Sequence, residues 1–364
     1  MEKISKKICG IIVSLFIIGF LCLTLVREKG EVSYHENRKL AEFPKLSSLA
    51  DGTFFSDLSD YAADHFAFRR RFLEINAKSH IYTGEPIVNN VYISKDMMLS
   101  AKERHSIKNS GNAEKINNFA KEYSGSVYVI AVPSSDGIYA EKLPENLTAC
   151  TQKSQIDSFY ASLDSGIKKI DAYNILKMLS DNYIYYRNDT KWTSYGAFCV
   201  YRTAVQKLGF KPVTYDKYLI EHMDTEFRGN LYNKTLSTVT KADMIDVYTC
   251  IDGKSVTEAV AYDKKGNAKR IELYDKSFLE TNTPYKFYLG GNDVVKIKTD
   301  IGNDKKILVF KDEFADCFIP FLTQHYSEIA VVSEKCRLSD YGGAIRLNDY
   351  NQVLFLGGAD NMVK

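Results

Sequence analysis

The sequence has no charge excess of either sign. Its 364 residues include 48 lysines and arginines against 46 aspartates and glutamates, so the formal net charge is only +2. A chain without a net positive field does not concentrate a polyanion by long-range attraction. Nucleic acid is therefore not an expected partner.

The cysteines and histidines lack the spacings of metal sites and disulfide frameworks. Two of the seven cysteines, Cys9 and Cys22, fall in an apolar N-terminal run, and the rest are far apart without a C-x-x-C pair. The six histidines show no metal-ligand spacing either. We expect no metal and no cofactor. The remaining cysteines are expected to be buried, reduced thiols, and they are Cys150, Cys199, Cys250, Cys317 and Cys336.

One long apolar run is present, at the N-terminus. Ile8–Val26 contains no charged residue, and lysines precede it at positions 3, 6 and 7. A run of this length spans a bilayer core, and lysines upstream favour a cytoplasmic N-terminus. The run predicts a cytoplasmic tip at 1–7, a transmembrane signal anchor at 8–26 and a juxtamembrane segment at 27–52. The domain at 53–364 is then extracytoplasmic.

A cleaved signal peptide is the competing interpretation of the same run. Such peptides carry a shorter apolar region that ends in small residues at the cleavage site. Here the run ends Leu23-Thr24-Leu25-Val26, followed by charges at 27–29. This pattern favours the anchor.

The hydropathy pattern beyond the anchor predicts a layered α/β domain. Short runs that are apolar on both faces are typical of strands in a buried parallel sheet, and helical stretches lie between them. Residues 53–78 carry apolar positions at helical spacing and predict one amphipathic helix. The stretch 212–300 alternates β-branched and polar residues, which predicts a β-rich insertion. Strands are expected at 127–132, 307–310, 328–332 and 353–356, and helices at 112–123, 152–163, 194–208 and 315–326.

Ligands of open α/β sheets bind beyond the carboxyl ends of the strands. Three polar segments follow apolar runs or precede helices in this way, and they cover residues 133–136, 188–194 and 311–316. The second contains Trp192, the single tryptophan of the chain, just before a helix that Thr193 or Ser194 is suited to cap.

The second segment resembles a known family signature. Residues 185–197, YYRNDTKWTSYGA, are similar to the D-x-H-W-T-x-x-G-A motif of the DHHW proteins and their AlgX/AlgJ-like relatives. Further landmarks agree in order, and they are Glu36-Asn37-Arg38 with Phe43-Pro44, then 64–69, 227–232, 289–292 and 307–326. The resemblance implies an SGNH-hydrolase-like, flavodoxin-like fold. Some members of the group O-acetylate exopolysaccharides of the bacterial cell envelope.

The resemblance also assigns catalytic positions, and this chain departs from them. The family motif supplies an aspartate-oriented histidine base and a serine nucleophile after the strand matched to 307–310. Here Asp189 is kept, but the histidine position is Lys191 and the serine position is Glu313. A protonated lysine accepts no proton at neutral pH, and glutamate is a poor acyl carrier. If the family geometry holds, Lys191 and Glu313 form an ion pair; unrelated drift of two surface positions is the alternative.

These substitutions predict a catalytically degenerate relative that acts by binding. The expected ligand-binding cleft contains Ser134, Ser135, Trp192, Asn292 and Asp312, and the expected partners are an envelope polysaccharide or a membrane-bound O-acyltransferase.

Two alternative functions fit the same sequence. The chain is an active O-acyltransferase or esterase with Glu313 as acyl carrier or acid and Lys191 as base, or it is a purely structural envelope protein. A substitute Cys317–His325 couple is disfavoured, since eight positions along one helix separate the two by about 12 Å.

Overall fold

The structure is a computed structural model, and it describes residues 2–26, 30–33, 36, 38–106, 110–147, 150–281, 283–341 and 343–364. The charges at 27–29 and the landmark Asn37 lie outside these residues. The chain divides into two compact units. The first contains residues 1–86 and 233–238, and the second contains residues 87–232 and 239–364.

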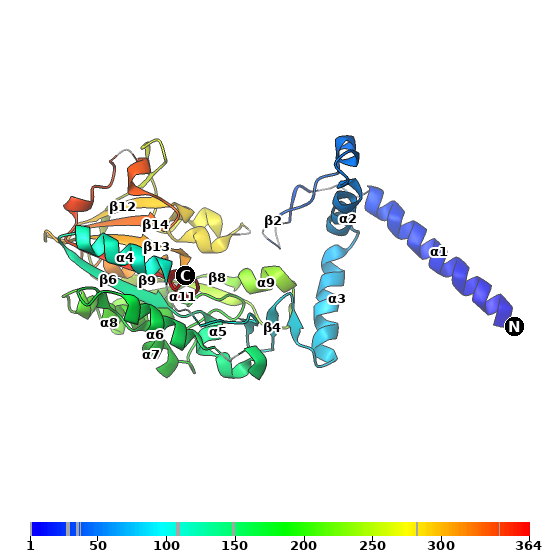
Figure 1. Ribbon diagram of the computed structural model, residues 1–364, viewed down its shortest axis with the longest axis horizontal. Helices are drawn as coiled ribbons and strands as arrows, with labels where there is room; N and C mark the ends of the chain where they lie inside the picture. Colours follow the sequence, from blue (N-terminus) through cyan, green and yellow to red (C-terminus); the bar gives the residue numbers. More distant parts are fainter. Residues whose placement is uncertain are drawn as a thin grey trace. The chain divides into compact units, whose positions relative to one another are not determined.

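The second unit is built on one eight-stranded mixed sheet (Figure 1). Its five strands from β14 to β7 are parallel, and β12, β10 and β11 extend the β14 edge in antiparallel fashion. The strand order is β11 (Ala268–Arg270), β10 (Val256–Tyr262), β12 (Val294–Thr299), β14 (Glu328–Ser333), β13 (Lys306–Lys311), β15 (Gln352–Gly358), β6 (Ser126–Val132) and β7 (Lys168–Lys169). The four strands predicted from the apolar runs are confirmed.

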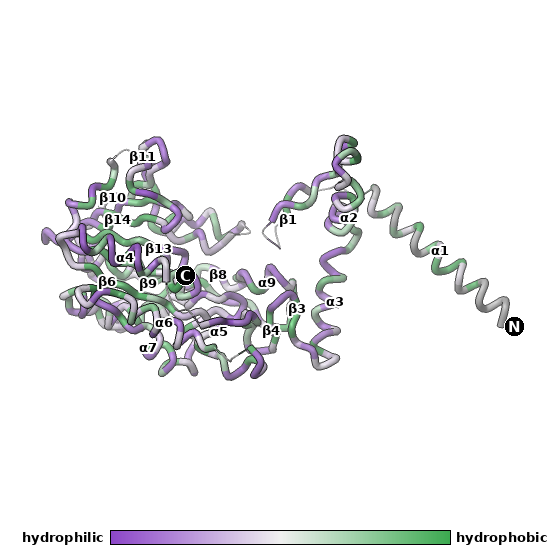
Figure 2. The backbone as a smooth tube through the Cα atoms, viewed as in Figure 1, coloured by the Kyte–Doolittle hydropathy of each residue, from purple (hydrophilic) through white to green (hydrophobic). Residues whose placement is uncertain are grey.

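The apolar runs form strands because both faces of the sheet are covered. In β6, Tyr128, Ile130 and Val132 point into one core, and the residues between them point into a second core on the other face. Helices α4 (Gly111–Glu122) and α6 (Gln152–Ser162) contribute to the second core. Helices α7 (Ala172–Met178) and α8 (Ser194–Lys207) contribute to the first. The hydrophobic colouring of the central strands can be followed in Figure 2.

The stretch 212–300 is β-rich, and only part of it stands apart from the central sheet. Strands β8 (Tyr218–Phe227) and β9 (Asp243–Cys250) pair only with each other, with α9 (Asn230–Thr235) between them. Strands β10 to β12 join the central sheet. Short elements complete the unit: β3 (Ile87–Val88), β4 (Val91–Ile93), β5 (Met98–Ser100), α5 (Ser135–Ile138), α10 (Ile319–Leu322), α11 (Ala359–Met362) and the 3₁₀ turns η2 (Ala140–Lys142), η3 (Glu145–Leu147), η4 (Tyr215–Lys217), η5 (Lys276–Phe278), η6 (Pro284–Phe287), η7 (Leu289–Gly291), η8 (Glu313–Ala315), η9 (Leu338–Tyr341) and η10 (Leu347–Asp349).

The prediction of one helix over 315–326 is wrong. The chain forms η8 and then the four-residue α10, with Pro320 near its start. Proline disfavours helical backbone at the residue before it and donates no hydrogen bond, so a helix that starts at 315 cannot run through this position undisturbed.

The first unit contains helix α1 (Glu2–Val26), α2 (Phe54–His65) and α3 (Arg69–Tyr82), with the short β1 (Val32–Ser33), β2 (Arg38–Lys39) and η1 (Leu46–Leu49). The predicted single helix over 53–78 is broken between α2 and α3. Phe68 adopts a left-handed backbone with φ 57°, and the Arg69 side chain donates to the carbonyl of Ala63, so the first helix ends before the second begins.

Within the described residues, no helix meets the length and apolarity required to cross a membrane. The anchor over 8–26 stays a prediction.

Candidate functional site

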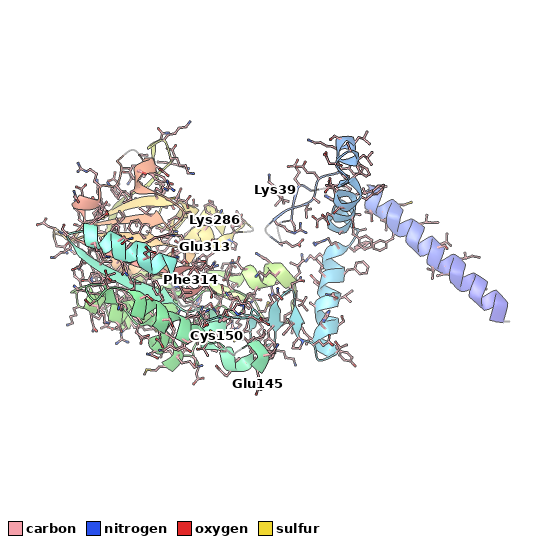
Figure 3. All side chains as sticks on the ribbon, viewed as in Figure 1. Lys39, Glu145, Cys150, Lys286, Glu313 and Phe314 are labelled. Carbon is pink, nitrogen blue, oxygen red and sulfur yellow. The ribbon has the colours of Figure 1, made fainter. Side chains whose placement is uncertain are left out.

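The three motif positions come together at the carboxyl end of β13. The Nζ of Lys191 lies 3.0 Å from Oδ1 of Asp189 and 3.3 Å from Oε2 of Glu313. The side chains of Lys191 and Asp189 are only 5% and 1% exposed, whereas that of Glu313 is 65% exposed. Glu313 and the adjacent Phe314 are labelled in Figure 3. A buried ion pair with one exposed partner, Glu313, therefore joins the three motif positions.

Backbone donors hold Asp189 in place. Its Oδ1 accepts from the backbone N–H of Lys191 at 3.0 Å, and its Oδ2 accepts from that of Asn230 at 2.8 Å. The segment turns back on itself, since the N–H of Tyr186 donates to the carbonyl of Lys191. Both carboxylate oxygens thus have fixed partners before the Lys191 side chain is counted.

The local electrostatics keep Lys191 charged. Burial lowers the pKa of Lys191, but the carboxylates of Asp189 and Glu313 outweigh burial and hold it above its ordinary value. The ammonium also lies 4.9 Å from the centre of the Tyr285 ring, which favours the cation. Lys191 is a proton donor here and has no free pair to act as a base at neutral pH.

Gly229 explains why the landmark at 227–232 contains a glycine. A Cβ at this position would lie 2.2 Å from Oδ2 of Asp189 and 2.4 Å from its Cβ. Only a residue without a side chain allows the backbone to approach the aspartate closely enough for Asn230 to donate to it.

The Gly229→Ala variant is expected to lose about 1–3 kcal/mol of unfolding free energy, because the added methyl group displaces Asp189. Gly166→Ala is the matched control, since a Cβ there meets nothing within 4 Å. Urea unfolding of both variants measures the difference. Equal stability of the two would show that Asp189 moves aside without cost.

Trp192 fastens the motif to the segment after β13. Its indole Nε1 donates to the carbonyl of Phe314 at 2.7 Å, and its ring stacks on Phe318 with an interplanar angle of 8°. It is fully buried. Trp192 therefore packs beneath the segment that carries Glu313. Thr193 caps α8 through Gly196, as predicted.

Asp312 and Asn292 stabilise their own turns. The carboxylate of Asp312 accepts from the backbone N–H groups of Phe314 and Gly358, which ties the ends of β13 and β15 together. Burial raises the pKa of Asp312 although these donors oppose the shift. The amide of Asn292 donates to the carbonyl of Leu289 at 2.8 Å.

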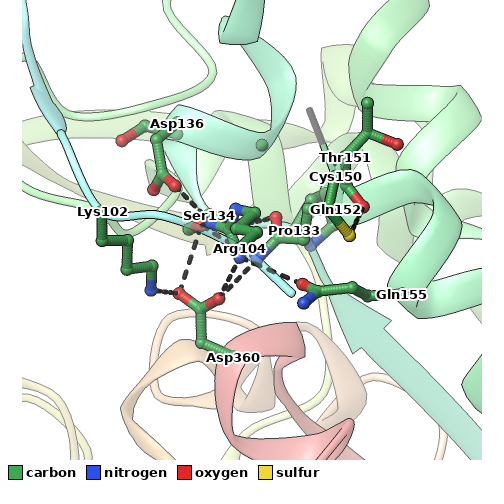
Figure 4. Close-up of polar contacts among 12 residues, drawn as sticks. Lys102, Arg104, Pro133, Ser134, Asp136, Cys150, Thr151, Gln152, Gln155 and Asp360 are labelled. Carbon is green, nitrogen blue, oxygen red and sulfur yellow. Dashed lines mark hydrogen bonds and ion pairs between the residues drawn. The ribbon is translucent and has the colours of Figure 1, made fainter. Parts of the chain in front are cut away.

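Ser134 and Ser135 are both buried. The backbone N–H of Ser135 donates to Thr190 at 3.0 Å, so this segment packs against the motif. Ser134 belongs to a polar network around Arg104 (Figure 4). The Arg104 guanidinium pairs with Asp136 and with Asp360, the latter at 2.5 Å.

Sequence reasoning did not identify Arg104 or Asn230. Arg104 lies outside regular structure, and its partners Asp136 and Asp360 are distant in the chain. Asn230 acts through its backbone N–H, which no side-chain pattern reports. The glycine before Asn230 was the available signal.

The structure also argues against a Cys317–His325 couple. His325 shares a 2.7 Å hydrogen bond with the hydroxyl of Tyr201. Burial raises the pKa of the Cys317 thiol to about 12, so the nucleophilic thiolate does not form at neutral pH. Within the described residues, no group of three or more histidines, cysteines or carboxylates is arranged to hold a metal ion.

His325 makes stability depend on pH. Burial lowers its pKa from 6.5 to about 4, so the unfolded chain takes up a proton below pH 6.5 that the folded chain resists. The unfolding free energy should therefore fall as pH drops from 6.5 towards 4, by about 2 kcal/mol from this group at pH 5. Urea unfolding at pH 7 and pH 5 measures the loss, and His325→Phe should lack it. An equal loss in both proteins would assign it to other groups.

Comparison with solved structures finds proteins of similar fold. A DHHW family protein from Eubacterium siraeum shares the fold with a TM-score of 0.65 and 22% identity, over 76% of this chain and 93% of that one. Bacillus cereus PatB1, solved with a sulfonyl adduct, has a TM-score of 0.61 and 19% identity, over 75% and 95%. The O-acetyltransferase domain of Pseudomonas putida AlgJ has a TM-score of 0.44 and 12% identity, over 76% and 93%.

No curated protein sequence matches the chain. The sequence profile described as DHHW protein matches residues 74–332, which include Asp189, Lys191, Gly229 and Glu313. This match covers well over half of the sequence, and it confirms the resemblance drawn from the motif at 185–197. The chain belongs to the DHHW protein family.

Proposed function

We propose that this protein is a membrane-anchored, extracytoplasmic DHHW protein that has lost acyl transfer and acts by binding in the assembly of an envelope polysaccharide. The observation that carries the proposal is the contact of Lys191 with both Asp189 and Glu313. An ammonium and a carboxylate stand where the family has a base and a hydroxyl.

Acyl transfer through a serine requires a group that takes the hydroxyl proton as the new ester bond forms. Lys191 cannot take it, because the two carboxylates hold its pKa above the ordinary value. A carboxylate at Glu313 would form a mixed anhydride, which water cleaves readily. The ion pair is therefore consistent with a scaffold that keeps a binding surface but no longer catalyses acyl transfer.

The alternative is an active O-acyltransferase or esterase with Lys191 as base and Glu313 as acyl carrier. It requires a neutral Lys191, and the raised pKa argues against one. PatB1 was solved with a sulfonyl adduct, and the AlgJ domain is described as an O-acetyltransferase. Those descriptions belong to those proteins. The likeness to PatB1 supports a shared scaffold for this chain. The proposed partner, an envelope polysaccharide or a membrane-bound O-acyltransferase, is inferred from the family resemblance of the sequence.

Attachment to the membrane is proposed from the sequence. The uncharged run Ile8–Val26 follows three lysines, which favours a cytoplasmic N-terminus and an outside domain. The described residues of this run are coloured as mostly hydrophobic in Figure 2.

The proposal is tested by treating the purified chain with a sulfonyl fluoride and with p-nitrophenyl acetate. We expect an unchanged mass and ester hydrolysis no faster than in buffer. PatB1, which has been solved with a sulfonyl adduct, is the positive control for the sulfonyl fluoride. An adduct on the chain, or turnover above that of the heat-denatured protein, would support the active enzyme instead.

Binding is measured by co-sedimentation with insoluble cell-wall polysaccharide. The native chain should pellet with it, and a chain that stays in the supernatant counts against the binding role.

A further inference from the structure

Helix α3 carries an exposed apolar stripe. Phe68, Phe72, Ile75 and Tyr82 are 55%, 45%, 60% and 93% exposed. Positions 72, 75 and 82 fall on one face of α3 at the helical period, with Ser79 between the last two, and Phe68 directly precedes the helix. A soluble protein scatters such residues singly, so an aligned set on one face indicates a surface that is covered in use.

The stripe continues onto helix α1 of the same unit. The ring of Phe20 lies 4.7 Å from that of Phe66, 6.0 Å from that of Phe68 and 5.7 Å from that of Phe72. The N–H of Ala67 donates to Oγ1 of Thr24 at 3.2 Å. The bend between α2 and α3 is therefore attached to the last two turns of α1.

The contact with α1 determines how deep the neighbouring phenylalanines would lie in a bilayer. Phe20 stands six residues before Val26, the last residue of α1, which is about 9 Å along the helix axis. If the apolar run ends at the outer surface of a bilayer, Phe66, Phe68 and Phe72 lie at the boundary between acyl chains and headgroups. Helices that lie at that depth carry Trp, Phe or Leu on their apolar face.

Cations flank the stripe. Arg71, whose side chain is 79% exposed, and Lys78 follow the apolar positions on one side. A hollow of about 390 Å³ in this unit is lined by Arg70, Arg71, Glu74, Lys78 and Thr238. Glu74 forms a 3.0 Å ion pair with Arg70, which leaves Arg71 and Lys78 as the cations that match a phosphate group.

We propose that the α3 stripe, defined as Phe68, Phe72, Ile75 and Tyr82, lies in the outer boundary of an anionic phospholipid bilayer, with Arg71 and Lys78 at the lipid phosphates. The apolar face and the flanking cations together are typical of a helix that lies in the membrane interface. The inference rests on the anchor of the proposed function, and it adds a second contact that fixes how the anchored unit meets the membrane.

The test uses the full chain reconstituted into vesicles of phosphatidylcholine and phosphatidylglycerol, with bromine on the upper part of the acyl chains as a fluorescence quencher. Tryptophan is placed on the stripe (Phe72→Trp), in the anchor (Ile12→Trp) and on the opposite side of α3 (Arg70→Trp). The native Trp192 is buried. Its emission is measured in the unchanged protein and subtracted from that of each variant.

We expect the bromolipids to remove most of the added emission of Phe72→Trp and Ile12→Trp and little of that of Arg70→Trp. Quenching of Ile12→Trp alone would overturn the interfacial stripe and leave the anchor standing. Quenching of neither would overturn both. An unquenched but blue-shifted Phe72→Trp, together with crosslinking that rises with protein density, would assign the stripe to a second copy of the chain.

The headgroup contact has its own control. Replacing phosphatidylglycerol by phosphatidylcholine, or combining Arg71→Glu with Lys78→Glu, should weaken the quenching of Phe72→Trp and leave that of Ile12→Trp unchanged. Equal quenching in all these conditions would overturn the role of the phosphates.

Discussion

Replacing Asp189 by alanine is expected to lower the unfolding free energy by about 3–5 kcal/mol, because the variant leaves the Lys191 ammonium buried without its principal partner. The Lys191 side chain is only 5% exposed, and the remaining partner Glu313 is 65% exposed and shared with water. The backbone N–H groups of Lys191 and Asn230 also lose their acceptor. Urea unfolding of the full-length chain, followed by circular dichroism, measures the loss.

Two companion variants separate the causes. Glu313→Gln removes the exposed arm of the pair and should cost no more than about 1 kcal/mol. Asp189→Ala combined with Lys191→Met removes the unpaired charge and should recover a large part of the lost stability. If the double variant is as unstable as Asp189→Ala alone, the carboxylate matters through its backbone acceptors and the ion pair contributes little.

Combining Lys191→His with Glu313→Ser is expected to give ester hydrolysis at least about 100-fold above either single variant, since a positioned base contributes at least that factor. The two partners work only as a pair, so the gain should be strongly non-additive. Asp189 remains in place to orient the new imidazole through the contact that now holds Lys191. Hydrolysis of p-nitrophenyl acetate and mass spectrometry after sulfonyl fluoride treatment both measure the result.

The matched control for this gain carries Lys191→His with Glu313→Ala. It has the base without a hydroxyl and should neither react nor take up the sulfonyl group. Activity in this control would place the nucleophile at another residue. A folded double variant without activity would mean that the backbone around 191 and 313 no longer has the spacing that the shorter side chains need.

The central strands were predictable because their physical signal is local. A strand covered on both faces must be apolar at nearly every position, and β6, β13, β14 and β15 read that way in the sequence. The meeting of Lys191 with Glu313 was predictable only through the family resemblance. Nothing local relates residues that are 122 positions apart.

Two helices predicted from the spacing of apolar residues are each interrupted by a single residue. Pro320 prevents the helix suggested by 315–326, and the left-handed Phe68 divides the helix suggested by 53–78. Strands β10 to β12 look like an insertion in the sequence because polar positions alternate along them, although they pair into the main sheet. The Arg104 network depends on contacts across more than 250 positions.

The bond from the Trp192 indole to the carbonyl of Phe314 joins the two loops on which Lys191 and Glu313 stand. Neither member of that bond takes part in proton transfer, so selection for the frame and selection for the reaction act on different residues. The side chains at 191 and 313 can therefore be exchanged without removing the bond that sets the spacing of their two loops.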